Sequence, residues 1–430
     1  MSSPKVLYIV HNHPEIRSGG VEVYSQELFQ AMRARPDFSA CLLAKGGAPF
    51  SAAQRPHEGT MISTVSPADD GQYLFHNEGG DYDHFLGTSC AKEHLVTYLD
   101  RFLTAVRPDV VHFHHTLYLG YDTLRQVRNS LPAAAIVYSL HDYLPICHRN
   151  GQLLRTNNRE RCHEPSPRRC HECFPAIAPR EFFLRERFIK AQLEHVDLFL
   201  APSEFLRERY IAWGLPREKI ICEPYGRAVI SARPGAASPD GSRWRFGFFG
   251  QMSLFKGVHV LLDAMKIIER LQPGAAHLWL HGNNLDLQPP EFQATVDALL
   301  TDTAASVTNS GPFQRKELRR LMENIDWVVV PSLWWENAPL VIQEAVMCGR
   351  PVICSDVGGM AEAVTSNENG LHFRVGDAMS LAETMRRAAT TPGLWDRLRQ
   401  QRPPGYPVAQ QAEKLTGLYR QLIAQRRALS

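Results

Sequence analysis

The sequence predicts an α/β protein made of two successive Rossmann-like domains, and three observations support this fold class. The 430 residues are too many for one compact hydrophobic core and sufficient for two. Short apolar runs rich in β-branched residues alternate with amphipathic stretches of helical period, the pattern of parallel strands joined by helices. A strand, a glycine loop and a helix open the chain at residues 5–32, and the same succession starts again at residue 245.

These two starts define the expected domains. We expect a first domain at residues 1–228, which carries a Cys-rich insert at 147–173, and a second domain at 229–406. A final helical segment follows at 407–430. Residues 231–243 are rich in Pro, Gly and Ser, which is typical of a linker or surface loop.

The composition is that of an ordinary globular protein, with 44% apolar and 21% charged residues. A net charge of +2 gives no reason to expect a nucleic acid as partner. No apolar run reaches the length of a membrane span, and the N-terminal MSSPKVLYIVHNHPE lacks the pattern of a secretion signal. We therefore expect a cytoplasmic protein, in which scattered cysteines are reduced thiols.

A glycine turn separates the first strand from the first helix. Ser18, Gly19 and Gly20 form this turn, and glycines at such a place let the backbone approach a phosphate or a sugar closely. A turn without any ligand explains the same residues equally well.

Histidines lie along and after two later strands of the first half. His141 and Asp142 end a strand, at the edge where open α/β sheets bind ligands, although a histidine hydrogen-bonded at the rim is an alternative. His112, His114 and His115 alternate around the preceding strand, a pattern more typical of packing against neighbours than of a metal site.

The insert contains four cysteines, Cys147, Cys162, Cys170 and Cys173, in a polar segment that we expect to be mainly loop. The last two have the C-x2-C spacing of a zinc knuckle, so a structural zinc ion is one prediction, and two disulfides or four free thiols are the others. The following basic helix, residues 179–196, is expected to cover the domain with its apolar side. Contact with an anionic membrane is the alternative.

In the second half, a strand at 245–249 and a glycine loop lead to a helix, and Lys256 lies just before that helix. A lysine beside a helix N-terminus suits a pyrophosphate, and a solvated lysine is the alternative. His281 and Gly282 follow the next strand. Farther along, Arg315, Arg319 and Arg320 are expected to be solvated.

Residues 325–359 form the most informative stretch of the chain. A buried strand at 327–331 precedes a loop containing Glu336, and a helix then begins near Leu340 and ends at Gly349. Asn337, Ala338, Pro339 and Leu340 can direct backbone N–H groups at an anion. The carboxylates of Glu336 and Glu344 repel phosphate and suit hydroxyls. The predicted ligand is therefore part sugar and part phosphate.

The spacing of Glu336 and Glu344 resembles the EX7E signature of retaining glycosyltransferases of family 4. That resemblance implies the GT-B fold, in which two Rossmann-like domains face each other across a cleft and a C-terminal helix returns to the first domain. It also implies roles for individual positions. Glu344 would hold the ribose hydroxyls and Glu336 the donor-sugar hydroxyls. His141 would face the donor sugar.

The remaining implied positions lie in loops. Gly19 and Gly20 would face the acceptor and the donor phosphates, and Phe313 would border the base with its turn. Gln251 and Lys256 resemble the family's phosphate loop, G-R-x4-K-G, but Gln251 stands where arginine is common. Lys256 and nearby amides would therefore carry more of the diphosphate binding. The full expected donor-binding set is Gly19, Gly20, Gln251, Lys256, Gly282, Phe313, Asn337, Ala338, Pro339, Leu340 and Glu344.

The resemblance implies hexosyl transfer with retention, from a nucleotide diphosphate sugar to a hydroxyl of an acceptor, which is a glycan, a lipid-linked glycan or a small molecule; polysaccharide biosynthesis is the expected setting. His141, Lys256 and Glu336 are the expected catalytic residues, with no metal or other cofactor in catalysis. Charge on the departing diphosphate would be stabilised by Lys256 and helix amides. Two alternatives remain: a GT-B-fold nucleotide-sugar epimerase, and a non-catalytic sugar-nucleotide binding subunit, which the missing arginine at Gln251 favours.

Overall fold

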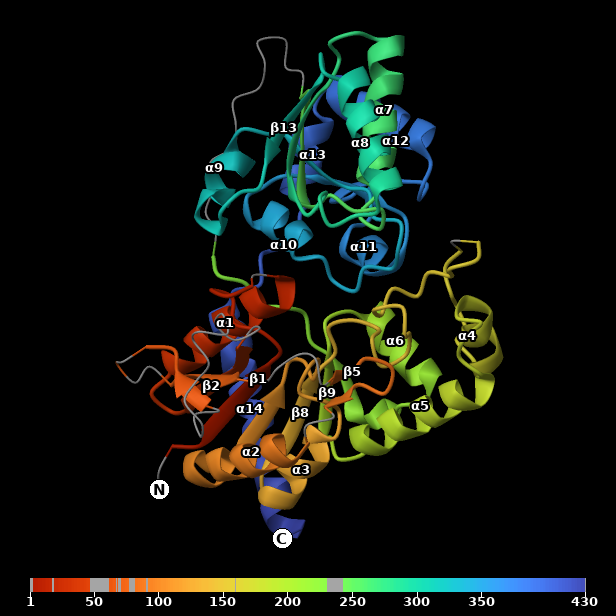
Figure 1. The fold of residues 1–430 in the computed structure, drawn as a ribbon. Coiled ribbons are helices and arrows are strands. Elements are labelled where there is room, and N and C mark those ends of the chain that lie inside the picture. The colour runs from red at the N-terminus through yellow and green to blue at the C-terminus, as the bar shows by residue number, and fades with distance from the viewer. Residues whose placement is uncertain are drawn as a thin grey trace. The chain divides into compact units, whose positions relative to one another are not determined.

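A computed structural model of the chain describes residues 3–17, 19–46, 62–66, 68, 71–76, 82–89, 92–158, 160–229 and 243–429. The chain divides into two compact units (Figure 1). One contains Met1–Ala228 together with Tyr406–Ser430, and the other contains Val229–Gly405. Ser18, Arg159 and nearly all of the expected linker, residues 231–242, lie outside the described residues.

The first unit is built on an eight-stranded sheet in the order β10-β9-β8-β7-β1-β2-β4-β3. All neighbours are parallel except β3 and β4. The strands are β1 Lys5–Val10, β2 Ser39–Gly46, β3 Ile62–Thr64, β4 Gln72–His76, β7 Val110–Phe113, β8 Ala135–Ser139, β9 Leu198–Ala201 and β10 Ile220–Cys222. A small antiparallel pair, β5 Tyr82–Asp83 and β6 Thr88–Ser89, lies apart from this sheet. The central strands are buried because helices cover both faces of a parallel sheet.

Helices join these strands as the apolar periodicity predicts. They are α1 Gly20–Arg33, α2 Lys92–Val106, α3 Thr123–Ser130, α4 Pro167–Cys173, α5 Pro179–Leu193, α6 Glu204–Trp213 and the C-terminal α14 Val408–Leu429. A short 3-10 turn, η3, spans Arg217–Lys219. The C-terminal helix belongs to the first unit, where the Tyr419 hydroxyl lies 2.7 Å from His112 Nδ1 on β7. This return of the last helix agrees with the predicted fold class.

The Cys-rich insert is more regular than expected. It contains the helix α4, whose N-terminus is capped by the Ser166 hydroxyl and begins with Pro167. Serine at the N-cap and proline at the first helical position are both signals for a helix start, and the polar composition of the segment obscured them. An isolated bridge between Leu154 and Arg161 closes a hairpin ahead of that helix.

The second unit contains a six-stranded, wholly parallel sheet in the order β13-β12-β11-β14-β15-β16. Its strands are β11 Arg245–Gln251, β12 His277–Asn283, β13 Val307–Gly311, β14 Trp327–Val330, β15 Val352–Ser355 and β16 Gly370–Phe373. Its helices are α7 Val258–Leu271, α8 Pro290–Asp302, α9 Leu318–Glu323, α10 Leu340–Met347, α11 Gly358–Ala363, α12 Ala378–Thr390 and α13 Leu394–Gln400, with the 3-10 turn η4 Arg315–Glu317.

The central strand β14 shows why the sheet is buried on both faces. Trp327 and Val329 belong to one hydrophobic core, and Val328 and Val330 belong to another. Successive side chains of a strand point to opposite faces, so an unbroken apolar run of this kind requires cover on both sides. No helix among the described residues is both long enough and apolar enough to cross a bilayer.

Candidate functional site

The loop between β14 and α10 holds Glu336 in a network of donors at the carboxyl edge of the second unit's sheet. Glu336 Oε1 lies 2.6 Å from the Lys256 ammonium and accepts from the Ser332 hydroxyl at 2.7 Å and the Trp334 indole at 2.9 Å. Glu336 is only 4% exposed. Burying a carboxylate this deeply is costly unless it is paired and hydrogen-bonded, and these three donors meet that requirement.

Glu344 lies on α10, two turns after Glu336, and has a cationic partner of its own. Arg315 of η4 donates to Glu344 Oε1 at 2.7 Å, and the Glu344 side chain is 9% exposed whereas that of Arg315 is 40% exposed. Arg315 is thus exposed, as expected, but it also has an ion-pair partner that was not expected, because the turn after β13 brings it beside α10. Sequence gives no signal for this pair, whose members are separated by other elements.

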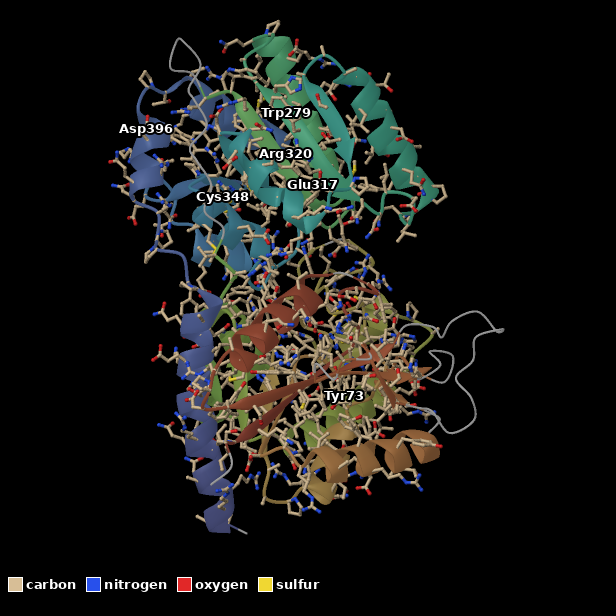
Figure 2. All side chains as sticks on the ribbon, turned by 90° about the vertical axis from the view of Figure 1, so that its left-hand side faces the viewer. Tyr73, Trp279, Glu317, Arg320, Cys348 and Asp396 are labelled. Carbon is tan, nitrogen blue, oxygen red and sulfur yellow. The ribbon has the colours of Figure 1, made fainter. Side chains whose placement is uncertain are left out.

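The two neighbouring arginines differ from Arg315. Arg319 pairs with Glu323 on its own helix. Arg320 pairs with Glu317 one turn earlier, and Figure 2 labels both of these residues. Both arginine side chains are more than half exposed. They form helix-surface pairs, whose contribution to stability is small.

Glycines bring the loops of this edge into close contact. Gly257 has φ +69°, and a Cβ atom there would lie 1.9 Å from the carbonyl oxygen of Pro331. A Cβ on Gly359 would meet the carbonyl oxygen of Asn337 at 1.9 Å, and its backbone N–H donates to the Glu336 carbonyl at 2.7 Å. Gly257 therefore lets the Lys256 loop approach the start of the Glu336 loop, and Gly359 lets α11 approach the Glu336 loop itself.

The other predicted donor positions line the same edge. Gln251, which is exposed, pairs in register with Asn283 at the ends of β11 and β12. Gly282 packs against Gly250 and Met252, which explains the glycine without a ligand. The Phe313 ring contacts Phe249 edge to face at 5.6 Å. Three of the other predicted positions, Asn337, Ala338 and Pro339, lead into α10, which begins at Leu340 with Pro339 at its N-cap.

In the first unit, the glycine turn and His141 lie in different environments. Gly19 is the N-cap of α1, and a Cβ there would lie 2.6 Å from Glu22 Oε2. His141 is 8% exposed, and both of its ring nitrogens have protein partners: Nε2 lies 3.1 Å from His114 Nδ1, and Nδ1 lies 2.6 Å from the Tyr225 hydroxyl. Burial holds the pKa of His141 well below its usual value, so the ring is neutral at pH 7.

Two family models match the chain over most of its length. The model described as Glycosyltransferase Family 4 covers residues 18–226, and the model described as Glycosyl transferases group 1 covers residues 243–391. The chain belongs to glycosyltransferase family 4. The predicted family is therefore confirmed, and the two matches fall on the two units in turn.

Solved structures confirm the GT-B fold for this family 4 chain. HepE from Anabaena in complex with UDP and glucose has a TM-score of 0.64 at 17% identity, over 97% of this chain and 100% of that one. Sucrose-phosphate synthase from Thermosynechococcus elongatus has a TM-score of 0.70 at 19% identity, over 98% and 100%.

Among curated relatives, the amylovoran biosynthesis glycosyltransferase AmsK of Erwinia amylovora is 27% identical over 200 residues. Those residues are 44% of this chain and 47% of AmsK. The family 4 chain thus spans about half the length of that relative.

The four cysteines of the insert lie close together. The pKa of Cys170 is raised to about 12, first by burial and then by the neighbouring thiols of Cys147, Cys162 and Cys173. All four are free cysteines. Within the described ranges, no three His, Cys, Asp or Glu side chains are arranged as a ready metal site. The thiol side chains would have to reorient to coordinate an ion, and the zinc prediction stays a prediction.

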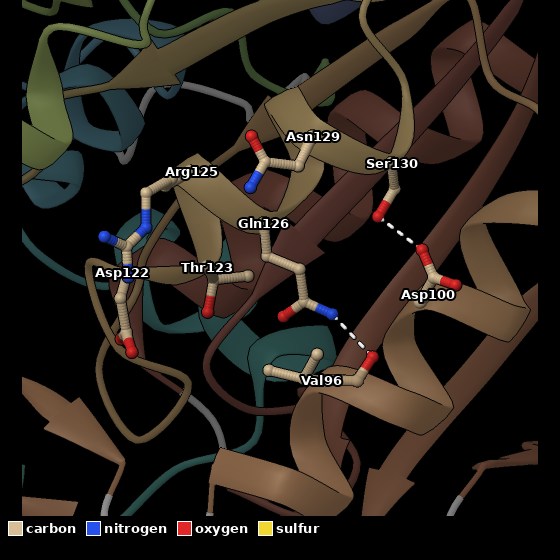
Figure 3. Close-up of a pocket in the computed structure, with 8 residues that line it drawn as sticks. All are labelled: Val96, Asp100, Asp122, Thr123, Arg125, Gln126, Asn129 and Ser130. Atoms are coloured by element: carbon tan, nitrogen blue, oxygen red, sulfur yellow. Dashed lines mark hydrogen bonds between the residues drawn. The ribbon is translucent and has the colours of Figure 1, made fainter.

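A pocket in the first unit lies away from all of these residues (Figure 3). Residues of α2 and α3 line it, and two hydrogen bonds cross it, from Gln126 to the Val96 carbonyl at 2.7 Å and from Ser130 to Asp100 at 2.6 Å. It contains none of the predicted site residues, and it lies beside helices rather than at the carboxyl ends of strands, where this fold class binds ligands.

Proposed function

We propose that the protein is a glycosyltransferase that moves a hexosyl group from a nucleotide diphosphate sugar to an acceptor hydroxyl, with retention and without a catalytic metal. The observation that carries this proposal is the arrangement at the carboxyl edge of the second unit's sheet. Two carboxylates flank the start of α10, and each has a cation as its partner, Lys256 for Glu336 and Arg315 for Glu344. Cations suit a diphosphate, and carboxylates suit sugar hydroxyls.

The two pairs suggest how a donor binds. A diphosphate brings negative charge to Lys256, whose side chain is 29% exposed and can turn away from Glu336. Glu336 keeps its bonds from Ser332 and Trp334, and its carboxylate becomes available to sugar hydroxyls. Lys256 then stabilises the charge that grows on the leaving diphosphate, which is usually the largest contribution to catalysis.

The nature of the acceptor is a further part of the proposal. An acceptor sugar or lipid-linked glycan in polysaccharide biosynthesis is supported by the name of AmsK, an amylovoran biosynthesis enzyme. Contact with the cytoplasmic face of a membrane is supported by α5, where Phe183 and Leu184 are 48% and 59% exposed beside the exposed Arg180 and Arg187.

The proposal is tested with UDP-, GDP-, ADP- and dTDP-glucose in thermal unfolding. A nucleotide sugar that binds the folded state raises the unfolding temperature by mass action, whereas glucose alone does not. Release of nucleoside diphosphate on addition of an acceptor then separates the transferase from a non-catalytic binding subunit. Absence of stabilisation by all four nucleotide sugars would contradict the proposed function.

We also propose a structural zinc ion in the insert, held by Cys147, Cys162, Cys170 and Cys173. Burial first, and then neighbouring thiols, raise the pKa of Cys147, Cys162 and Cys170, and a metal that binds the thiolate forms would offset this cost. Protein purified without chelators should contain about one zinc per chain by elemental analysis. Replacing Cys170 and Cys173 by Ser should remove it, whereas replacing the separate Cys41 should not.

A further inference from the structure

A polar cluster lies at the carboxyl edge of the first unit's sheet. Three adjacent strands, β1, β7 and β8, end there. His11 directly follows β1, His115 lies two residues after β7, and Asp142 lies three residues after β8. Glu22, in the first turn of α1, completes the cluster. The carboxyl ends of parallel strands are where α/β sheets bind ligands.

The carboxylate of Asp142 is held in one orientation by two donors, one of which is itself oriented by a third group. The backbone N–H of Leu117 donates to His115 Nδ1 at 2.9 Å, so the proton of a neutral His115 is on Nε2. The Nε2–H group of His115 donates to Asp142 Oδ2 at 2.8 Å, and the backbone N–H of Leu144 donates to Asp142 Oδ1 at 2.7 Å. Each carboxylate oxygen can still accept another hydrogen bond, and the Asp142 side chain is 31% exposed.

His11 and Glu22 form a second pair, next to the His115 ring. His11 Nε2 lies 3.0 Å from Glu22 Oε1, and the His11 and His115 rings lie 4.4 Å apart between centroids. Because Glu22 accepts, the proton of a neutral His11 is on Nε2, which leaves Nδ1 as a hydrogen-bond acceptor. That nitrogen is buried and has no partner among the described residues. A buried acceptor without a donor is costly, and a hydroxyl group can satisfy it.

The neighbouring His141 is less suited to contact a ligand. Its ring nitrogens are both engaged, by His114 and by Tyr225, and the residue is 8% exposed. Of the two neighbours His141 and Asp142, only Asp142 can therefore accept a new hydrogen bond without losing an existing one.

We propose that this cluster binds hydroxyl groups of the acceptor sugar, with Asp142 as the contact and His115 as the residue that positions it. This inference rests on the proposed function, since it names the acceptor side of that reaction. Two carboxylates, Glu22 and Asp142, repel an anionic group and attract hydroxyl donors, so the ligand is an uncharged saccharide rather than a phosphate or a uronic acid.

Acceptor kinetics test this assignment. Release of nucleoside diphosphate from UDP-, GDP-, ADP- and dTDP-glucose is measured with rising concentrations of the methyl glycosides of glucose, galactose and mannose. Asp142→Asn should raise the half-saturating glycoside concentration by about tenfold or more, the effect of losing one charged hydrogen bond. Binding of the nucleotide sugar, measured separately by calorimetry, should change less than twofold.

Matched variants separate positioning from general damage. His115→Gln keeps an N–H donor toward Asp142, and it should impair acceptor saturation less than His115→Ala. Asp83→Asn is the control, because Asp83 also accepts two backbone N–H groups in the first unit, from Phe85 and Leu86, outside the cluster. It should leave acceptor saturation unchanged.

The outcomes are distinguishable. Equal acceptor saturation in wild type and Asp142→Asn overturns the inference, as does a loss confined to nucleotide-sugar binding, which would place Asp142 on the donor's sugar. Release that is stimulated by methyl glucuronide but by none of the three neutral glycosides overturns the uncharged-saccharide assignment. Failure of all four nucleotide sugars to bind overturns the proposed function instead.

Discussion

At the scale of residues, the site of the second unit consists of opposite charges that neutralise one another in pairs. Lys256 and Arg315 each pair with one of the two carboxylates. Pairing of this kind keeps buried Glu336 compatible with the fold, and it holds both cations at the place where a diphosphate would arrive. A ligand that supplies phosphate and hydroxyl groups together can replace both pairings at once.

Replacement of Lys256 by Ala should lower turnover more than replacement of Gln251 by Ala. Lys256 supplies a full charge beside the leaving group, and Gln251 is an exposed amide. We expect a loss of at least tenfold in kcat for Lys256→Ala and less than threefold for Gln251→Ala, measured as nucleoside diphosphate release. Equal losses would remove Lys256 from the phosphate site.

Sequence could not have identified the ion pairs. The residues of the Lys256–Glu336 pair are separated by 80 positions and those of the Arg315–Glu344 pair by 29. Only the parallel order of the strands brings them together. The positions of Lys256, Glu336 and Glu344 at loops of one sheet edge were predictable, because the apolar strands before them are easily recognised. Their partners depend on how the loops pack.

At the scale of elements, the glycine contacts determine how closely the loops approach. Gly257 combines a left-handed φ with a carbonyl oxygen at the place of its missing Cβ. The sequence indicated a glycine loop at this place and suggested that its backbone approaches a phosphate. The structure gives a second reason for this glycine, which is the contact between the loops themselves. Both reasons place glycine at the same position, so the pattern alone does not separate them.

Gly257→Ala should destabilise the second unit by about 2 kcal/mol or more, through both strain and steric overlap. Gly274→Ala is the matched control, because Gly274 has φ +76° and open space around its Cβ position. It should cost only the backbone strain, about 1 kcal/mol. Chemical denaturation of the two variants measures the difference, and equal destabilisation would exclude an effect of the Pro331 contact.

At the scale of the whole molecule, the division into two parallel-sheet units follows from the alternation of strand and helix patterns. That part of the fold was predictable, because buried parallel strands are apolar throughout and β14 is an example. The return of α14 to the first unit was implied only by the family resemblance. The helix is held there by a hydrogen bond between Tyr419 and His112, which lie 307 positions apart in the sequence. No local sequence pattern predicts this contact.

The first unit should lose stability as the pH falls below about 6.5. Burial, with a smaller effect of His141, lowers the pKa of His112 to about 3. At a pH between about 3 and about 6.5, His112 is protonated in the unfolded chain and neutral in the folded chain, so acidification favours unfolding. The expected cost is about 1.4 kcal/mol for each pH unit below about 6.5 for this one histidine.

Chemical denaturation at pH 7.5 and pH 5.5 checks this expectation. His112→Gln can still donate to Ser139 but does not titrate, so the difference in stability between the two pH values should be smaller in this variant. An unchanged difference would show that His112 does not contribute to the pH dependence.

The central claim is that the carboxyl edge of the second unit binds an activated sugar, and calorimetric titration of Glu344→Ala with the nucleotide sugar that stabilises the wild type tests it most directly. Loss of the carboxylate should weaken binding by about 1–3 kcal/mol, because hydroxyl groups of the ligand lose a buried partner. Glu323→Ala, which removes a carboxylate paired with Arg319 on a neighbouring helix, should bind like the wild type. Equal affinity of wild type and Glu344→Ala would contradict the account.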